Sequence, residues 1–223
     1  KTRSILAADV MKKKKDNSKV DKLLILSGII GPTVFFLTIY LLLPLLFPDY
    51  NAARDYISEL GAVDSPVKTI ANVFGFSLFG IFVMLFAIAV FKSKELNNLK
   101  KISAVFIFAT GILMYFVGIF TCDAACESFS LRGSLHNTVS NWQFPILAVG
   151  YILLFLSLMG NKKLGWLMPV ILILGAASLV SAYISLLSFP PPENPGIIQR
   201  IAIGLPYLLM MIIAWALYRA RKH

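Results

Sequence analysis

Charge is the scarcest property of this sequence. Only 14% of its 223 residues are Asp, Glu, Lys or Arg, and 58% are hydrophobic, whereas soluble domains average about 25% charged residues. The mean hydropathy of +0.78 agrees with this composition. A chain of this length holds about six apolar helices of about 20 residues each and leaves no room for a separate soluble domain. The composition therefore excludes an ordinary soluble protein and indicates an integral membrane protein.

Histidine and cysteine are also scarce, with two residues of each. A zinc site usually needs three or four protein ligands. One of the histidines, His223, lies in the C-terminal segment, which we expect on the opposite side of the membrane from the cysteines. Only His136 remains near Cys122 and Cys126, so zinc would have to recruit a carboxylate from Asp123 or Glu127. We therefore expect no metal ion and no cofactor. A single available histidine also excludes the multi-histidine zinc site of some membrane lipid hydrolases.

Six apolar runs are long enough to cross a bilayer. In lipid such a run has to be helical, because its backbone groups find no hydrogen-bond partner outside the segment. The runs cover residues 23–47, 67–91, 102–121, 136–159, 164–187 and 201–218. The sequence thus predicts an all-α integral membrane protein with six transmembrane helices.

Basic residues are distributed unevenly between the two sides of this topology. Seventeen of the twenty-one fall in the two chain ends and in the second and fourth connections, and only Arg54, Lys68, Arg132 and Arg200 fall on the other side. Because basic loops stay in the cytoplasm, we expect both termini there, in a protein of the cell membrane. The net charge of +10 then reflects topology and attraction of the N-terminal tail to anionic lipid, and not binding to nucleic acid.

The expected organisation has three parts. A basic cytoplasmic tail covers residues 1–22, a six-helix membrane domain covers 23–218, and a short basic cytoplasmic end covers 219–223. The first apolar run is too long for a secretory signal and lacks a small-residue cleavage site, so we expect it to remain as an anchor.

Small residues and prolines predict how the helices pack. Helices in lipid meet through small side chains, which Gly111 and Gly118 offer on the third run and Ala177, Ser181 and Ser185 offer on the fifth. Prolines are expected to kink four of the helices, with neighbouring groups bonding to the carbonyls that each proline leaves free. They are Pro32, Pro145, Pro169 and Pro206.

The remaining polar residues gather on the side opposite the termini. Cys122 and Cys126 lie there in the polar connection 122–135, where oxidation is permitted. At helical spacing their Cα atoms would be about 6 Å apart, within bridging range, so we favour a disulfide over metal binding. His136, Ser140 and Gln143 follow at i, i+4 and i+7, hence on one face of a helix. The candidate ligand-binding residues of this side are Glu59, Asn72, Asp123, His136, Gln199 and Arg200.

Several of these residues resemble the family Domain of Unknown Function 998. The resemblance covers nearly the whole membrane region, and its residues have the order and spacing of the family. They are Gly31-Pro32, the segment 56–61 (YISELG), Asn72, Phe120, Asp123, Cys126, His136 and the segment 196–200 (GIIQR). The resemblance implies a six-helix integral membrane protein and no established activity.

Three functions are compatible with these residues, and whether the protein is an enzyme stays open. In the favoured one, an outer pocket binds or transports a lipid headgroup or a small polar ligand, with Arg200 on an anionic group and Asp123, His136 and Gln199 orienting it. In the second, Ser58 is the nucleophile of a lipid hydrolase or transferase, with His136 as its base and Asp123 or Glu59 orienting the imidazole. In the third, the bundle is a non-enzymatic subunit packed against another membrane protein.

Overall fold

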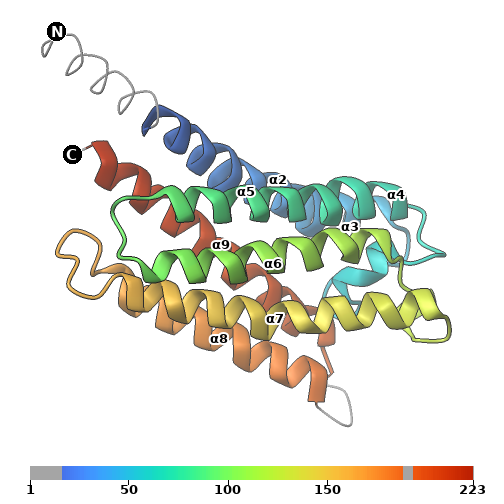
Figure 1. The fold of residues 1–223 in the computed structure, drawn as a ribbon. Coiled ribbons are helices and arrows are strands. Elements are labelled where there is room, and N and C mark those ends of the chain that lie inside the picture. Colours follow the sequence, from blue (N-terminus) through green and yellow to red (C-terminus); the bar gives the residue numbers. More distant parts are fainter. Residues whose placement is uncertain (1–16, 188–192, 223) are drawn as a thin grey trace, which may run out of the picture.

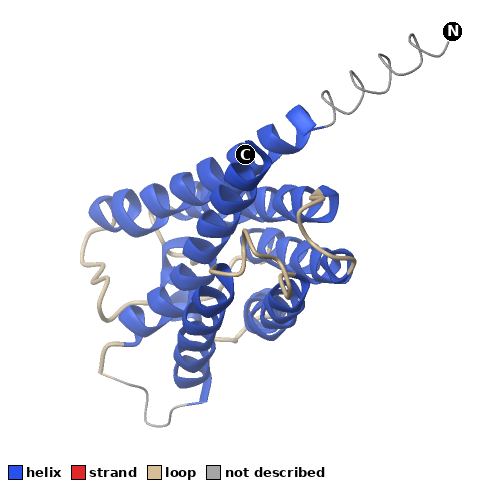
Figure 2. Cartoon of the chain, turned by 90° about the vertical axis from the view of Figure 1, so that its left-hand side faces the viewer, coloured by secondary structure: helices blue, strands red, loops and turns tan. Residues whose placement is uncertain are grey.

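The computed structural model describes residues 17–187 and 193–222. Six helices in this part of the chain are long and apolar enough to cross a membrane, and they run up and down as a bundle (Figure 1). No strand occurs among the described residues (Figure 2). The predicted all-α fold with six apolar helices is confirmed.

The first long helix spans Asn17–Leu46 and changes its winding along its length. After residues 17–25, two wide π-helical stretches, η1 (Leu26–Ile30) and η2 (Phe36–Leu42), alternate with α2 (Gly31–Phe35) and α3 (Leu43–Leu46). Each wide stretch is followed by a proline in the first turn of the next segment. Because proline cannot donate to the carbonyl four residues back, the winding of the helix adjusts around these positions.

The second long helix also contains a wide stretch, η4 (Ala71–Ser77), between α4 (Lys68–Ile70) and α5 (Leu78–Lys92). The other four long helices are regular: α6 (Leu99–Ile119), α7 (Leu131–Ser157), α8 (Leu167–Leu187) and α9 (Pro195–Lys222). Two short 3₁₀ turns, η3 (Ile57–Gly61) and η5 (Ala124–Cys126), lie in the connections.

The α7 and α9 helices begin at Leu131 and Pro195, several residues before the predicted starts at 136 and 201. The α7 helix begins at Leu131 because Ser130 caps it, with its hydroxyl accepting a hydrogen bond of 3.0 Å from the Gly133 amide. The α9 helix begins at Pro195, a residue suited to the first turn because its missing N–H is not needed there. As a result, His136 and Arg200 lie inside helices and not at their mouths.

The core of the bundle forms around α9, which packs against the first helix and against α8. Three aromatic rings from three helices meet there: Phe35 stacks on Phe79 at 4.3 Å, and Tyr207 contacts Phe79 edge-on at 4.5 Å. The α5 and α6 helices approach so closely that a Cβ on Gly80 would lie 2.7 Å from the Gly111 carbonyl. The predicted packing role of Gly111 is therefore confirmed.

The predicted packing face of the fifth run is displaced. The buried residues of α8 include Ile171, Ser178 and Ala182, whereas Ala177 and Ser181 are only half-buried. The α8 helix is thus rotated relative to the expected small-residue face, and Ser178, not Ser181, contacts α9 through a hydrogen bond of 2.8 Å to the Ala202 carbonyl.

The start of the first long helix (dark blue) and the end of α9 (red) lie at one end of the bundle (Figure 1). Arg221 of α9 fixes this end, with hydrogen bonds of 2.7 Å to Asp21 and 3.1 Å to Glu95. We call the opposite end, which carries η3 and η5, the distal end. The cytoplasmic location of the termini stays a prediction.

Candidate functional site

A small cavity of about 50 Å³ lies at the distal end, between η3, α6, α7, α8 and α9. We call it the polar cavity, because hydroxyl and amide side chains line part of its wall. None of its lining residues is charged. The polar lining residues are Ser58, Ser140, Asn141, Gln143, Ser185 and Gln199.

Gln199 of α9 connects the polar cavity to the first distal loop. Its Oε1 accepts a hydrogen bond of 2.6 Å from the Ile57 amide, and its Nε2 donates to the Ser58 hydroxyl at 3.4 Å. Residues 142 positions apart in sequence are therefore joined by one amide group. Of the predicted site residues, Ser58 and Gln199 are brought together here.

The α7 helix supplies the other polar wall. Gln143 is buried, and its Oε1 accepts a hydrogen bond of 3.2 Å from the Tyr207 hydroxyl. The Ser140 hydroxyl is buried and has no hydrogen-bond partner, although Thr138 on the same helix donates to the carbonyl four residues back. The i, i+4, i+7 spacing had placed Ser140 and Gln143 on one face, but neither was among the predicted ligand-binding residues.

A larger apolar crevice of about 330 Å³ lies between α7 and α8, next to the polar cavity. We call it the α7–α8 crevice. Phe144 belongs to the walls of both hollows, and Pro206 of α9 lies on the crevice wall. A Cβ added to Gly175 of α8, another lining residue, would meet no atom within 4 Å. This glycine therefore borders open space.

His136 is buried, with 1% of its surface exposed, and it does not line the polar cavity. Its Nδ1 lies 2.6 Å from the Phe120 carbonyl and 3.1 Å from that of Val117. These carbonyls belong to the last turn of α6, where the helix has no amide left to bond them. The imidazole thus caps α6 from α7, while its Nε2 is buried and has no partner.

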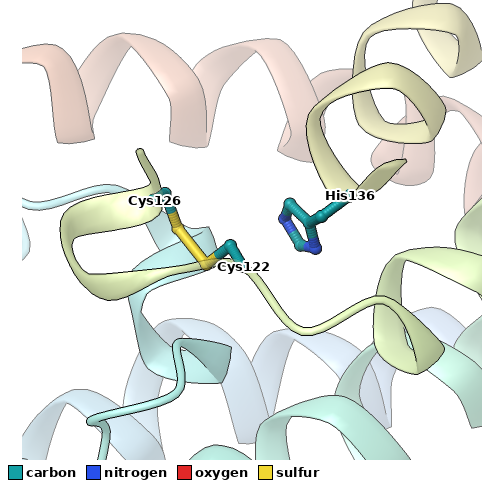
Figure 3. Close-up of side chains that lie close together, drawn as sticks. All are labelled: Cys122, Cys126 and His136. Carbon is teal, nitrogen blue, oxygen red and sulfur yellow. A yellow bond between two sulfur atoms is a disulfide. The ribbon is translucent and has the colours of Figure 1, made fainter. Parts of the chain in front are cut away.

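The two cysteines form a disulfide next to this imidazole. Figure 3 shows the ring of His136 turned toward the sulfur atoms. One ligand atom from each of Cys122, Cys126 and His136 lies within 4.8 Å of the other two. Among the described residues, this is the group of side chains that could hold a metal ion.

Asp123 lies beside this cluster but is engaged elsewhere. Its two oxygens accept hydrogen bonds of 2.7 Å from the amide and the hydroxyl of Ser130. These bonds hold the pKa of the Asp123 carboxyl below its ordinary value. The side chain therefore fixes the connection before α7, and it makes no hydrogen bond to His136.

Arg200 clamps α9 to the first distal loop. Its guanidinium donates to the carbonyls of Asp55 and Gly196 at 3.0 and 3.1 Å and to the Tyr50 hydroxyl at 2.5 Å. Burial raises the pKa of Tyr50 to about 12, although the Arg200 charge opposes this. Arg200 does not line the polar cavity. It lines a separate, mostly apolar hollow of about 430 Å³ between α9 and the first long helix, and its contact with an anionic ligand stays a prediction.

The two remaining predicted residues stabilise η3. The Glu59 carboxylate accepts a hydrogen bond of 2.8 Å from the Tyr56 amide, and burial raises the pKa of Glu59 above its ordinary value. Asn72 donates to the Gly61 carbonyl at 2.8 Å, and its Oδ1 is buried without a partner. Neither side chain lines the polar cavity.

The geometry gives no support to the hydrolase arrangement. In the described part of the chain, His136 makes hydrogen bonds to carbonyls only, and the Ser58 hydroxyl bonds to Gln199. The nucleophile, base and orienting carboxylate of such an enzyme need to be hydrogen-bonded in series. Ser58, His136 and Asp123 have no hydrogen bond to one another.

Comparison with known proteins identifies the family. The family model described as "Protein of unknown function (DUF998)" matches residues 29–216. The chain belongs to this family. No curated protein and no solved structure matches the chain.

The residues that carry the resemblance to DUF998 lie mainly at the distal end. The segment 56–61 contains η3, and the segment 196–200 forms the first turns of α9. In this DUF998 protein the two segments contact each other through Gln199 and Ile57. The shared motifs therefore build the wall of the polar cavity and the clamp beside it.

Proposed function

We propose that this DUF998 protein binds a membrane lipid at its distal end. The hydrocarbon chain lies in the α7–α8 crevice, and an uncharged hydrogen-bonding group of the lipid, such as a hydroxyl, enters the polar cavity. The observation that carries the proposal is that an apolar crevice and a polar cavity lie on the same three helices, α7, α8 and α9, and share Phe144 as a wall residue.

The volumes support a ligand with one slender chain. The crevice, at about 330 Å³, is at the lower end of the range of about 300–1,000 Å³ for small-molecule sites. The cavity, at about 50 Å³, has space for one or two waters or a single small functional group. A phosphate headgroup would not fit, and the lining residues offer it no cation.

The unpartnered hydroxyl of Ser140 supports a ligand that forms hydrogen bonds. A buried polar group without a partner costs about 1–3 kcal/mol, and within a membrane water is not freely available to replace the partner. A ligand hydroxyl can accept from Ser140 and donate to the Oε1 of Gln143, which already accepts from Tyr207. The proposed ligand thus satisfies the polar wall of the cavity.

The first test removes the polar contact. Ser140→Ala deletes a buried hydroxyl that bonds to no protein atom, so we expect the thermal stability of the ligand-free protein to rise and not to fall. Binding of a photoactivatable C16 alcohol by the detergent-purified protein should weaken roughly two- to tenfold, the loss of one hydrogen bond. Thr138→Ala is the matched control, because it removes an exposed hydroxyl on the same helix. Equal labelling of wild type and Ser140→Ala would contradict the proposal.

The second test fills the crevice. Gly175→Phe adds a ring where a Cβ meets no atom, and Ile173→Phe adds one on the exposed face of the same helix. We expect labelling to be lost in the first variant and kept in the second. Unlabelled C16 alcohol should compete better than phosphatidylglycerol. Competition by phosphatidylglycerol alone would show that a charged headgroup is bound, and would overturn the assignment to the polar cavity.

A further inference from the structure

We propose that Cys122, Cys126 and His136 form a redox-controlled zinc site, closed by the disulfide when oxidised and open to Zn²⁺ when reduced. The site is separate from the polar cavity, whose lining includes none of these three residues. It therefore does not depend on lipid binding.

The ligand atoms of the three side chains lie close together. One atom from each side chain lies within 4.8 Å of the others. Zn–S bonds of about 2.3 Å and Zn–N bonds of about 2.0 Å separate ligand atoms by about 3.5–3.8 Å in a tetrahedral site. On reduction the two sulfur atoms have to separate from bonding distance to this spacing, and the imidazole nitrogen has to approach them by at most about 1 Å. Ala125 and Cys126 in the loop between the sulfurs have left-handed backbones with φ of 52° and 53°, a conformation that non-glycine residues seldom adopt, so we expect this loop to rearrange when the S–S bond is broken.

The imidazole of His136 has the tautomer and the hydrogen bonds of a zinc ligand. Its Nδ1 lies within hydrogen-bond distance of the carbonyls of Phe120 and Val117, which places the proton on Nδ1 and a lone pair on Nε2. Zinc-bound histidines are held in this way, with the other ring nitrogen donating to a carbonyl. The Nε2 of His136 is buried and has no partner, and the ring faces the two sulfur atoms (Figure 3).

The charges of the three ligands favour a divalent ion. Two thiolates and a neutral imidazole cancel the charge of a divalent ion, whereas a monovalent ion would leave a net negative charge next to the fully buried Cys122. Asp123 is held by Ser130, so three protein ligands are available and water takes the fourth position. Cys126 is partly exposed, which gives that water a route to the ion.

Reduction of the disulfide by a dithiol opens the site. Two thiols of a dithiol reductant supply two electrons and two protons, the protein S–S bond breaks, two S–H bonds form, and the reductant becomes a disulfide. Zn²⁺ then replaces both thiol protons, which go to water. In the reduced, metal-free state the Cys122 thiol can donate to the Ser58 carbonyl, 3.3 Å from its sulfur.

The test compares two states of one chain. The full chain is purified in detergent without metal, then either left oxidised or reduced with a phosphine that does not bind zinc tightly. After equilibration with Zn²⁺ and desalting, we expect about one zinc per reduced chain and none per oxidised chain. Co²⁺ in place of Zn²⁺ should give thiolate-to-cobalt absorption in the reduced protein only. Reduced wild type without zinc would overturn the proposal.

Three variants separate this site from adventitious binding. His136→Asn keeps a side-chain N–H for the Phe120 carbonyl but removes the ligand, and Cys126→Ser removes one thiolate; both should lower zinc affinity at least tenfold. Asp64→Asn is the control, because it removes an exposed carboxylate in the loop that bonds to the Cys122 carbonyl through Val63, and it should bind zinc normally. Undiminished zinc binding and cobalt absorption in His136→Asn would rule out the three-ligand site.

Discussion

Asp123 determines where α7 begins. Its carboxylate accepts two hydrogen bonds from Ser130, and the Ser130 hydroxyl in turn accepts from the Gly133 amide. The first turn of α7 is thus held by a chain of three hydrogen bonds that starts at a charged group. A carboxylate near a helix N-terminus also interacts favourably with the helix dipole.

This arrangement makes the stability of the α7 start depend on pH. The hydrogen bonds from Ser130 lower the pKa of Asp123 below its ordinary value of 3.8. Its contribution is therefore complete above about pH 4 and is lost as the pH falls through the lowered pKa. We expect Asp123→Asn to reduce the melting temperature in detergent by a few degrees at pH 6, and the difference from wild type to be smaller at pH 3 than at pH 6.

Asp64→Asn serves as the control for that measurement, because Asp64 is exposed and its side chain makes no hydrogen bond in the described part of the chain. Its melting temperature should follow that of the wild type at both values of pH. A difference between Asp123→Asn and wild type that is the same at pH 3 and pH 6 would show that the carboxylate charge does not stabilise α7.

Single residues show what a sequence predicts and what it does not. The spacing of His136, Ser140 and Gln143 correctly places them on one face, because helical periodicity follows from the backbone alone. It does not show that the imidazole bonds to the end of α6 while Ser140 and Gln143 line a cavity. That difference arises from their positions along α7: His136 lies level with the end of α6, and Ser140 and Gln143 lie one and two turns further along, beside the cavity.

At the scale of helices, Pro206 shows how a membrane helix tolerates a proline. The missing N–H leaves the Ala202 carbonyl without its helical partner, and the Ser178 hydroxyl of α8 donates to that carbonyl at 2.8 Å. The Tyr151 hydroxyl of α7 donates to the carbonyl of Pro206 itself at 2.7 Å. The proline in α9 thus holds three helices together through two hydrogen bonds.

A double-mutant cycle tests the role of Ser178. We expect Ser178→Ala to reduce the free energy of unfolding by about 1–3 kcal/mol, because it leaves a buried carbonyl unpaired. In a Pro206→Ala background the new amide N–H bonds to the Ala202 carbonyl, and the same substitution should cost less than about 0.5 kcal/mol. Ser181→Ala, on the same helix, is the control. Equal costs in both backgrounds, measured by reversible denaturation in mixed micelles, would contradict this account.

Helix number was easier to predict than helix ends. Six apolar runs suffice to predict six helices, since a lipid environment leaves the backbone no alternative. The starts of α7 and α9 lie in polar sequence, where hydropathy gives no signal and capping by Ser130 or the position of Pro195 decides. The packing face of α8 was misplaced because small residues occur on two of its faces, and Ser178 is selected by the free carbonyl on α9.

At the scale of the whole molecule, the two ends of the bundle are joined differently. At the distal end α9 is joined to the first distal loop by hydrogen bonds to uncharged groups, which Gln199 accepts and Arg200 donates. The other end is held by ion pairs, in which Arg221 joins Asp21 of the first helix and Glu95 of the connection after α5. At both ends the contacts are made by α9, so the last helix is bonded to other parts of the bundle at each of its two ends.

The ion pairs around Arg221 are expected to stabilise the fold. Only 3% of the Arg221 side chain is exposed, and its two carboxylate partners are 14% and 18% exposed. Removing Arg221 leaves Glu95 without its cation and leaves Asp21 with Lys222 alone, 3.5 Å away. Loss of one member of a buried ion group typically costs about 3–5 kcal/mol. Arg221→Met should reduce the free energy of unfolding by an amount near the lower end of that range, since water reaches part of both carboxylates.

Two further variants distinguish loss of the charge from loss of the side chain. Arg219→Met removes an exposed cation from the same turn, where it lies over the Trp215 ring, and should cost less than about 1 kcal/mol. Adding Asp21→Asn and Glu95→Gln to Arg221→Met removes the two carboxylate charges that Arg221 had paired, so the triple variant should recover most of the lost stability. If the triple variant unfolds as easily as Arg221→Met, the contribution of Arg221 comes from packing of its aliphatic chain and not from its charge.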